Sequence, residues 1–272
     1  MKPLAQWPLE ARRRLVGVLT DIDDTLTTDG AITADALQAL ADLKAAGLVV
    51  IAITGRSVGW SEPFARTWPV DAIVAENGAV ALINTSQIGL KRKSSLHEQL
   101  SKTYIQDALT RSANFARMQQ AAQRVLAEVP GAQLSKDSSG RETDIAIDHS
   151  EFTRLPADRV SQVVAILQSE GMHATVSSIH INGWFGDHDK WVGACWIVQA
   201  LLGRDLAADR DLWAYVGDST NDQCMFAALF NSIGVANVQR FEAQMACKPT
   251  YITHKERGAG FAEAVIALLA AR

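Results

Sequence analysis

Three aspartates near the N-terminus have the type and spacing for metal-assisted chemistry. They lie in the segment Asp21-Ile22-Asp23-Asp24-Thr25, directly after the apolar run 15–19. Such a run is typical of a buried strand in a parallel sheet, and ligands bind at the carboxyl edge of open α/β sheets. Carboxylates this close repel one another, and a hard divalent cation such as Mg²⁺ would hold them. Taken alone, the segment is equally compatible with an acidic turn that caps the next helix.

Further polar residues stand at corresponding places along the chain. Thr54-Gly55-Arg56 and the segment Gly217-Asp218-Ser219-Thr220-Asn221-Asp222 each follow an apolar run, and Lys190 begins a predicted helix. Because the carboxyl ends of parallel strands meet at one edge of a sheet, these residues would lie near Asp21. We therefore predict that they converge on one pocket.

The elements that position these residues alternate between strand and helix. Apolar runs of strand length alternate with helical stretches in the first and last parts of the chain, which predicts a doubly wound, Rossmann-like α/β sheet. The pattern between them, including a helical stretch over 96–129, is that of a smaller α+β unit. We predict a core made of residues 1–84 and 188–272, with residues 85–187 as an inserted domain.

Composition narrows the possible partners and the compartment. The 272 residues are 48% hydrophobic and 21% charged, as in ordinary globular proteins. A net charge of -4 argues against nucleic acid, and we interpret Lys91-Arg92-Lys93 as a solvated loop. Three cysteines without metal spacing indicate core thiols in a reducing compartment. Without a signal-like N-terminus or a membrane-length apolar run, we expect a soluble, cytoplasmic protein with no membrane partner. Its oligomeric state is not indicated.

In their order along the chain, these four sets of polar residues resemble the motifs of the haloacid dehalogenase superfamily of phosphohydrolases. The matching residues are the DIDDT segment, the TGR segment, the lone lysine and the GDSTND segment. The insertion between the second and third sets, together with Glu76-Asn77-Gly78-Ala79, is similar to the subfamily with a large α/β cap. That subfamily includes sugar-phosphate phosphatases and phosphomannomutases. The resemblance implies a phosphohydrolase whose inserted domain covers the site and selects the substrate.

Phosphoryl transfer then suggests a role for each acid. Asp21 is the candidate nucleophile, which would form an aspartyl-phosphate. Asp23 is the candidate general acid, which would protonate the leaving oxygen and then activate water. Mg²⁺ would be held by Asp21, Asp218 and the backbone carbonyl of Asp23. Asp222 is either a further ligand or acts through water.

The remaining motif residues would bind the substrate. The hydroxyl of Thr54 and the amide of Gly55 are expected to contact the phosphoryl oxygens. Lys190 combines a positive charge with the free N–H groups of a helix start, which together make an anion site. Arg56 either binds substrate or pairs with an acid where the two domains meet. Asn221 either orients Lys190 or contacts the phosphoryl group.

Other residues of the inserted domain allow two interpretations each. His180 and Asn182 lie where the chain returns to the core, and they either face the leaving group or are structural. Arg141 either recognises a second polar or anionic group or lies in a solvated turn. The remaining aromatic residues of this region are expected to pack the junction between the domains, and they are Trp184, Phe185 and Trp191.

The function that fits these residues best is a Mg²⁺-dependent phosphatase acting on a small phosphate ester, with sugar phosphates as the expected class. A phosphomutase of hexose phosphates is one alternative, and it must keep the aspartyl-phosphate away from water. A sugar-phosphate sensor without catalysis is another, although a binding module has no need of the paired Asp21 and Asp23.

Overall fold

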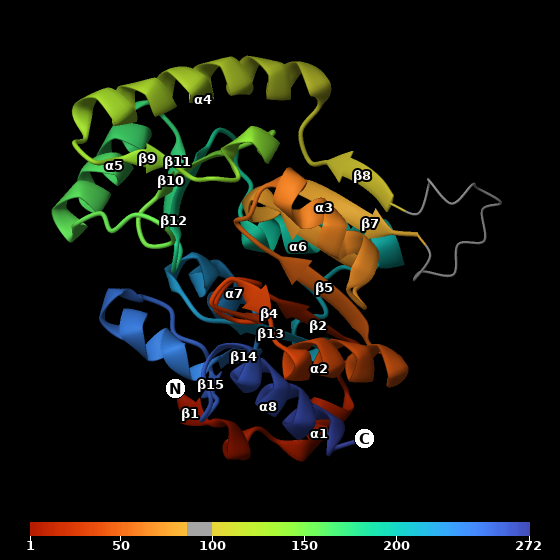
Figure 1. The fold of residues 1–272 in the computed structure, drawn as a ribbon. Helices are drawn as coiled ribbons and strands as arrows, with labels where there is room; N and C mark the ends of the chain where they lie inside the picture. Colours follow the sequence, from red (N-terminus) through yellow and green to blue (C-terminus); the bar gives the residue numbers. More distant parts are fainter. Residues whose placement is uncertain (86–99) are drawn as a thin grey trace.

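A large mixed sheet forms the centre of the protein. The computed structural model describes residues 1–85 and 100–272, so the cluster Lys91-Arg92-Lys93 lies outside the described residues. The strands from β1 to β6 in the order of the sheet are parallel, and β7 and β8 are antiparallel to their neighbours (Figure 1). In that order the strands are β1 (Lys2–Pro3), β15 (Tyr251–Ile252), β14 (Asn231–Gly234), β13 (Trp213–Gly217), β2 (Gly17–Thr20), β5 (Val49–Ile53), β6 (Ala72–Ala75), β7 (Val80–Asn84) and β8 (Leu100–Tyr104).

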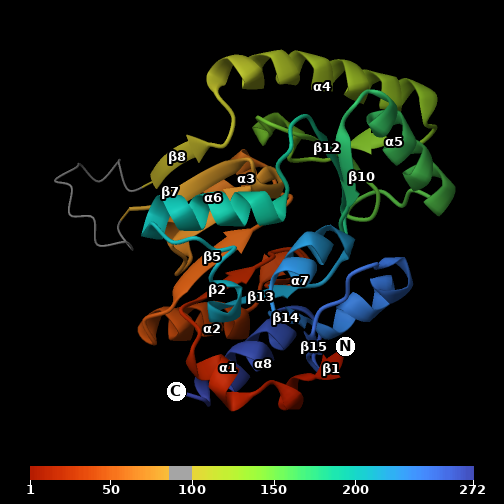
Figure 2. The same cartoon turned by 180° about the vertical axis from the view of Figure 1, so that it is seen from behind.

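Helices cover both faces of this sheet. Successive residues of a strand point to opposite faces, so Val18 and Leu19 of β2 belong to two different apolar clusters. Helices α1 (Leu9–Arg13), α2 (Ala34–Ala45), α3 (Val58–Thr67) and α8 (Arg257–Leu269) pack on the face of Val18. Helices α6 (Lys190–Leu202) and α7 (Gln223–Ala228) pack on the face of Leu19, which Figure 2 turns towards the viewer. The predicted doubly wound α/β architecture is confirmed.

A smaller antiparallel sheet forms a separate layered unit above the carboxyl edge of the large sheet (Figure 1). Its strands, in order, are β11 (His173–Val176), β12 (His180–Trp184), β10 (Ile145–Asp148) and β9 (Gln133–Leu134). Helices α4 (Ala108–Glu128) and α5 (Ala157–Ser169) cover one face and share an apolar cluster with the strands. We call residues 107–187 the cap.

Short elements complete the description. Strands β3 (Thr27–Thr28) and β4 (Ala31–Ile32) form a small hairpin just after the DIDDT segment. The 3₁₀ helices are η1 (Leu4–Gln6), η2 (Glu76–Gly78), η3 (Ser138–Gly140), η4 (Arg210–Leu212), η5 (Thr220–Asp222) and η6 (Ala236–Gln244). No helix in the described ranges has the length and apolar character required to cross a bilayer.

The N-terminal boundary of the inserted domain differs from the prediction. Residues 100–104, expected to be helical, form β8, which pairs with β7 in the large sheet. Its sequence Leu-Ser-Lys-Thr-Tyr has no continuous apolar run because an edge strand is only partly buried. The helix begins later, where the Asp107 carboxylate accepts hydrogen bonds from the amides of Leu109 and Thr110.

The cysteines are free thiols, and their burial differs from the prediction for one of them. Cys195 and Cys224 are half-buried, whereas Cys247 is exposed and is therefore not a core residue. The exposed position follows η6, in a segment without regular secondary structure before β15. Among the aromatic residues predicted at the junction, Trp184 and Phe185 are buried, and the indole N–H of Trp184 donates to the carbonyl of His188.

Candidate active site

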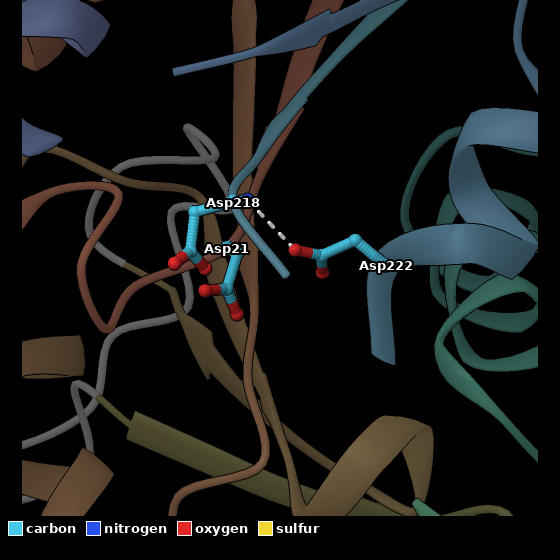
Figure 3. A group of neighbouring side chains, drawn as sticks. All are labelled: Asp21, Asp218 and Asp222. Carbon is cyan, nitrogen blue, oxygen red and sulfur yellow. Dashed lines mark hydrogen bonds between the residues drawn. The ribbon is translucent and has the colours of Figure 1, made fainter. Parts of the chain in front are cut away.

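Two neighbouring strands of the large sheet bring the acidic residues together. Asp21 follows β2 and Asp218 follows β13, and the backbone N–H of Asp21 donates to the carbonyl of Val216 at 2.9 Å. Asp222 approaches from η5, as Figure 3 shows. One carboxylate oxygen from each of the three aspartates lies within 4.8 Å of the others, and all three side chains are buried. The predicted convergence of the first and last motifs is thus present.

Lys190 lies between two of these carboxylates. Its Nζ donates to Oδ1 of Asp21 at 2.6 Å and to Oδ1 of Asp222 at 2.7 Å, and the side chain is 1% exposed. Burial opposes the positive charge, but the two carboxylates outweigh it and raise the pKa of Lys190. Asp189 caps helix α6 by accepting from the amide of Val192, which fixes the helix start beside the carboxylates.

The carboxylate of Asp222 accepts hydrogen bonds from four donors of the protein. Its Oδ1 accepts from Lys190 and from the hydroxyl of Tyr215 at 2.5 Å. Its Oδ2 accepts from the backbone amides of Asp218 and Ser219, at 2.9 and 3.1 Å. These contacts favour a role in positioning Lys190 and the loop after β13 over direct ligation of a metal.

Asp218 differs from Asp222 in its hydrogen bonds, because one of its carboxylate oxygens has no partner among the described residues. Oδ2 accepts from the side-chain amide of Asn237 at 3.0 Å. Oδ1 is buried and has no hydrogen-bond partner among the described residues. Burial, reinforced by the charges of Asp21 and Asp222, raises the pKa of Asp218 well above its usual range.

The electrostatics of Asp21 point to the same requirement for a cation. Burial raises the pKa of Asp21 to about 8, even though Lys190 acts to lower it. A buried, unpartnered carboxylate oxygen beside a second carboxylate is the donor set that a hard divalent cation prefers. The residues present therefore fit Mg²⁺, with Asp21 and Asp218 as side-chain ligands. Because the Asp23 carboxylate is engaged elsewhere, only its backbone carbonyl is left for a metal.

The carboxylate of Asp23 is paired with the guanidinium group of Arg56. The guanidinium donates to both oxygens of Asp23 at 2.8–3.0 Å, and its other edge donates to Glu151 of the cap at 2.8 and 3.2 Å. His180 lies 2.9 Å from the same Glu151 carboxylate. Of the two roles expected for Arg56, the structure contains the pairing with acids where core and cap meet.

Thr54 and Gly55 directly follow strand β5, which pairs with the strand that carries Asp21 at its end. Thr54 is fully buried, and its Oγ1 accepts from the backbone N–H of Arg56 at 3.0 Å, which leaves the hydroxyl hydrogen available to an acceptor. The carbonyl of Gly55 accepts from Arg141 at 3.0 Å and from the side chain of Asn182 at 3.1 Å. The loop that carries the TGR segment is therefore fixed by donors from the cap.

The cap covers the carboxylates. A cavity of about 10 Å³ remains between them and the loop 177–180, which is space for roughly one water molecule. Asn221 lines this cavity together with Asp21, Asp23 and Gly55, and its Oδ1 accepts from the hydroxyl of Ser219. Since the described contacts of Asn221 include none with Lys190, the structure favours its contact with the phosphoryl group. Substrate entry requires the loop 177–180 to move.

Arg141 contacts the loop of the TGR segment, and the interpretation that it lies in a solvated turn is wrong. Its side chain is 2% exposed and is paired with Asp137 and Asp144. The carboxylate of Asp137 also accepts from the backbone N–H of Ser57 at 3.0 Å, directly after the TGR segment. Acids and bases at spacings of three and four residues were the signal in the sequence, but they did not indicate burial.

Glu76 of the segment Glu76-Asn77-Gly78 also joins the two parts of the molecule. Its buried carboxylate accepts from the backbone amide of Val58 in the core and from the amides of Glu142 and Thr143 in the cap. Glu151 was missed altogether, because it lies in a polar turn of the cap with no motif around it. Only the fold brings it to Arg56.

Solved structures with the same fold come from several organisms. The chain is similar to a protein from Thermoplasma acidophilum (14% identity, 94% of this chain and 99% of that chain, TM-score 0.68). It is also similar to a HAD/COF-like hydrolase from Plasmodium vivax (14% identity, 97% of this chain and 100% of that chain, TM-score 0.67). A third similar structure is that of the sucrose-phosphatase from Synechocystis, in complex with sucrose and phosphate (14% identity, 94% of this chain and 98% of that chain, TM-score 0.64). At this identity the likeness supports the fold.

The family follows from a direct match of the sequence. No curated protein sequence matches the chain significantly. The family model described as haloacid dehalogenase-like hydrolase, however, matches residues 18–180, which is more than half of the chain. The matched range includes the DIDDT and TGR segments and most of the cap. The chain therefore belongs to the family of haloacid dehalogenase-like hydrolases.

Proposed function

We propose that this enzyme is a Mg²⁺-dependent phosphatase that hydrolyses a small phosphomonoester, a sugar phosphate, through an aspartyl-phosphate on Asp21. The observation that carries the proposal is the buried group of Asp21, Lys190 and Asp218, in which one carboxylate oxygen of Asp218 has no partner among the residues that the structure describes. The sucrose-phosphatase with this fold supports the proposed class of reaction.

Asp21 and Asp23 would divide the reaction into two steps. Asp21 attacks phosphorus, a new oxygen–phosphorus bond forms, and the bond to the leaving oxygen breaks as that oxygen takes a proton from Asp23. In the second step Asp23 removes a proton from water, which attacks the phosphorus and releases phosphate and the free Asp21 carboxylate. The contacts from Arg56 hold Asp23 beside the cavity that Asp21 also lines.

Other residues would stabilise the charge of the transferred group. Mg²⁺ bound by Asp21 and Asp218 would neutralise phosphoryl oxygens that otherwise repel the attacking carboxylate. Lys190 supplies a permanent positive charge, and Asp222 keeps it in place. Asn221 lines the cavity and can donate a hydrogen bond into it, and the hydroxyl of Thr54 would contact the phosphoryl group from the end of the neighbouring strand. The cap would keep bulk water away from the aspartyl-phosphate.

The test is a phosphate-release assay over sugar phosphates and p-nitrophenyl phosphate, with and without Mg²⁺. We expect Mg²⁺-dependent release that falls by roughly 10³-fold or more in Asp21→Asn, because that variant lacks the attacking oxygen. Asp158→Asn removes a carboxylate that is 75% exposed on the cap, and it serves as the matched control with wild-type activity. Near-wild-type turnover by Asp21→Asn would exclude the proposed mechanism.

The same preparation separates the two alternatives. A phosphomutase would convert a hexose 1-phosphate into an isomeric ester without releasing phosphate. A sensor would bind a sugar phosphate in the presence of Mg²⁺ without changing it. Release of free phosphate from the same compounds supports the phosphatase over both.

A further inference from the structure

A groove beside Asp23 borders the small cavity at the carboxylates. It has a volume of about 360 Å³ and includes Asp23, Asp29, Glu151, Phe152 and Arg257 in its lining. Asp23 also lines the small cavity at Asp21, so the same side chain borders both spaces. If Asp23 protonates the leaving oxygen, as the proposed function requires, the rest of the leaving group extends into this groove.

The charges of this leaving-group groove are unbalanced. Four carboxyl groups and two guanidinium groups line it, and three carboxylates remain when Asp23 holds the proton that the proposed function assigns to it. Each arginine is already paired with two of the carboxylates: Arg56 with Asp23 and Glu151, and Arg257 with Asp24 at 3.1 Å and Asp29 at 2.8 Å. Among the described residues, therefore, no unpaired cation lines the groove, and an anionic leaving group would meet net negative charge.

A further cation, Lys136, lies close to the groove without lining it. The ammonium group of Lys136 lies 3.4 Å from the ring centre of Phe152, but Lys136 lines a neighbouring cavity of about 470 Å³ rather than the groove. Its position over an aromatic face already gives the ammonium a favourable electrostatic partner.

The uncharged part of the groove suits a polyhydroxylated molecule. Phe152 is 59% exposed and lines the groove, where it adds apolar surface against which a sugar can pack. Carboxylates only accept hydrogen bonds, so those of Asp29 and Glu151 suit hydroxyl donors. We propose that the groove binds a neutral, polyhydroxylated leaving group and that Asp29 disfavours phosphate esters with a second negative charge.

Matched substrate pairs test this proposal, which rests on the proposed phosphatase function. The pairs are glucose 6-phosphate with 6-phosphogluconate, and glycerol 3-phosphate with 3-phosphoglycerate, in which only the second member carries a carboxylate. We expect kcat/KM to be higher for the neutral member by about tenfold or more. Where neither member is hydrolysed, the inhibition constants against p-nitrophenyl phosphate should follow the same order.

The two proposals fail in different ways. Equal or better use of the carboxylated members, with Mg²⁺-dependent hydrolysis of p-nitrophenyl phosphate intact, would overturn the inference about the groove alone. The phosphatase proposal, and this inference with it, would be overturned if Asp21→Asn kept full activity. It would also be overturned if the wild type released phosphate from no ester, p-nitrophenyl phosphate included.

A variant links the preference to Asp29. The side chain is 85% exposed and its backbone has a φ of 51°, a left-handed conformation that asparagine also tolerates, so Asp29→Asn removes the charge without disturbing the fold. We expect the kcat/KM ratio of carboxylated to neutral member to rise about threefold, because Arg257 loses one of its two partners. Asp158→Asn, remote from the groove, should leave the ratio unchanged. An unchanged ratio in Asp29→Asn would refute the assignment.

Discussion

The Nζ of Lys190 lies 2.6 Å from Oδ1 of Asp21, although 169 residues separate them in the chain. The lysine side chain is 1% exposed, and its second carboxylate partner, Asp222, is fully buried. Buried charges of this kind are tolerated only when each has a partner. We therefore expect Lys190 to contribute to the stability of the site as well as to the proposed chemistry.

Removing this cation should destabilise the metal-free protein strongly. Lys190→Met keeps the length of the side chain but leaves Asp21 and Asp222 buried without a counter-charge. We expect the free energy of unfolding to fall by about 3–5 kcal/mol. Urea denaturation followed by circular dichroism measures the change. Lys248→Met, which removes an exposed lysine paired with Glu242, is the control and should stay within about 0.5 kcal/mol of wild type. An unchanged urea midpoint for Lys190→Met would contradict the buried-charge argument.

Asp218→Asn should separate stability from activity. In the absence of metal, the substitution removes a buried carboxyl group whose Oδ1 has no partner among the described residues and whose pKa is raised by burial, so we expect the unfolding free energy to rise by about 1–3 kcal/mol. The same variant lacks a proposed ligand of Mg²⁺, so added Mg²⁺, which we expect to raise the melting temperature of the wild type, should no longer raise that of the variant. Phosphate release should also fall.

The measurement is thermal denaturation of both proteins with and without MgCl₂. A variant that is less stable than wild type in the absence of metal would show that Asp218 is not strained by its surroundings. A variant that is still stabilised by Mg²⁺ as much as wild type would remove Asp218 from the ligand set.

The residues at strand ends could be predicted from sequence because their placement depends on local pattern. Apolar runs before Asp21, Thr54 and Asp218 identify parallel strands, and parallel strands share one carboxyl edge. The start of α6 at Lys190 was also predictable, since Asp189 is a favourable N-cap residue.

The contacts between core and cap could not be predicted, because they depend on how two separately formed sheets meet. Arg141 and Glu151 lie in polar turns that give no sign of burial in the sequence. β8 was missed for a related reason, since an edge strand needs one neighbour and no apolar run. The share of Arg56 in binding substrate stays a prediction, because both edges of its guanidinium contact carboxylates in this structure.

Arg141 should hold the cap on the core. Arg141→Met keeps much of the side-chain volume but leaves the paired Asp137 and Asp144 without their cation, and the carbonyl of Gly55 loses a donor. We expect a loss of about 3–5 kcal/mol in unfolding free energy. Urea denaturation tests this, with Arg159→Met as the control at a partly exposed site of the cap. Equal losses in the two variants would show that the buried network is not a significant source of stability.

His188 should make stability depend on pH in a defined window. The side chain is 4% exposed, its Nε2 has no partner among the described residues, and burial lowers its pKa from the usual 6.5 to about 4, with a smaller contribution from His173. The unfolded chain therefore binds a proton near pH 6.5, whereas the folded protein binds it only near pH 4. Because the unfolded state holds more protons between these values, the unfolding free energy falls as the pH is lowered from 6.5 to 4.

Through His188, lowering the pH from 6.5 to 4 reduces the unfolding free energy by about 3 kcal/mol, since each pKa unit corresponds to about 1.4 kcal/mol. This stability is fully present above pH 6.5 and is lost by pH 4. Urea denaturation at several pH values, compared between wild type and His188→Phe, isolates it because the other titrating groups are common to both proteins. The variant should lose part of the slope between pH 4 and 6.5, and His254→Gln, at a histidine that is 79% exposed, should keep it. Identical slopes in wild type and His188→Phe would mean that His188 is protonated in the folded protein as readily as in the unfolded chain.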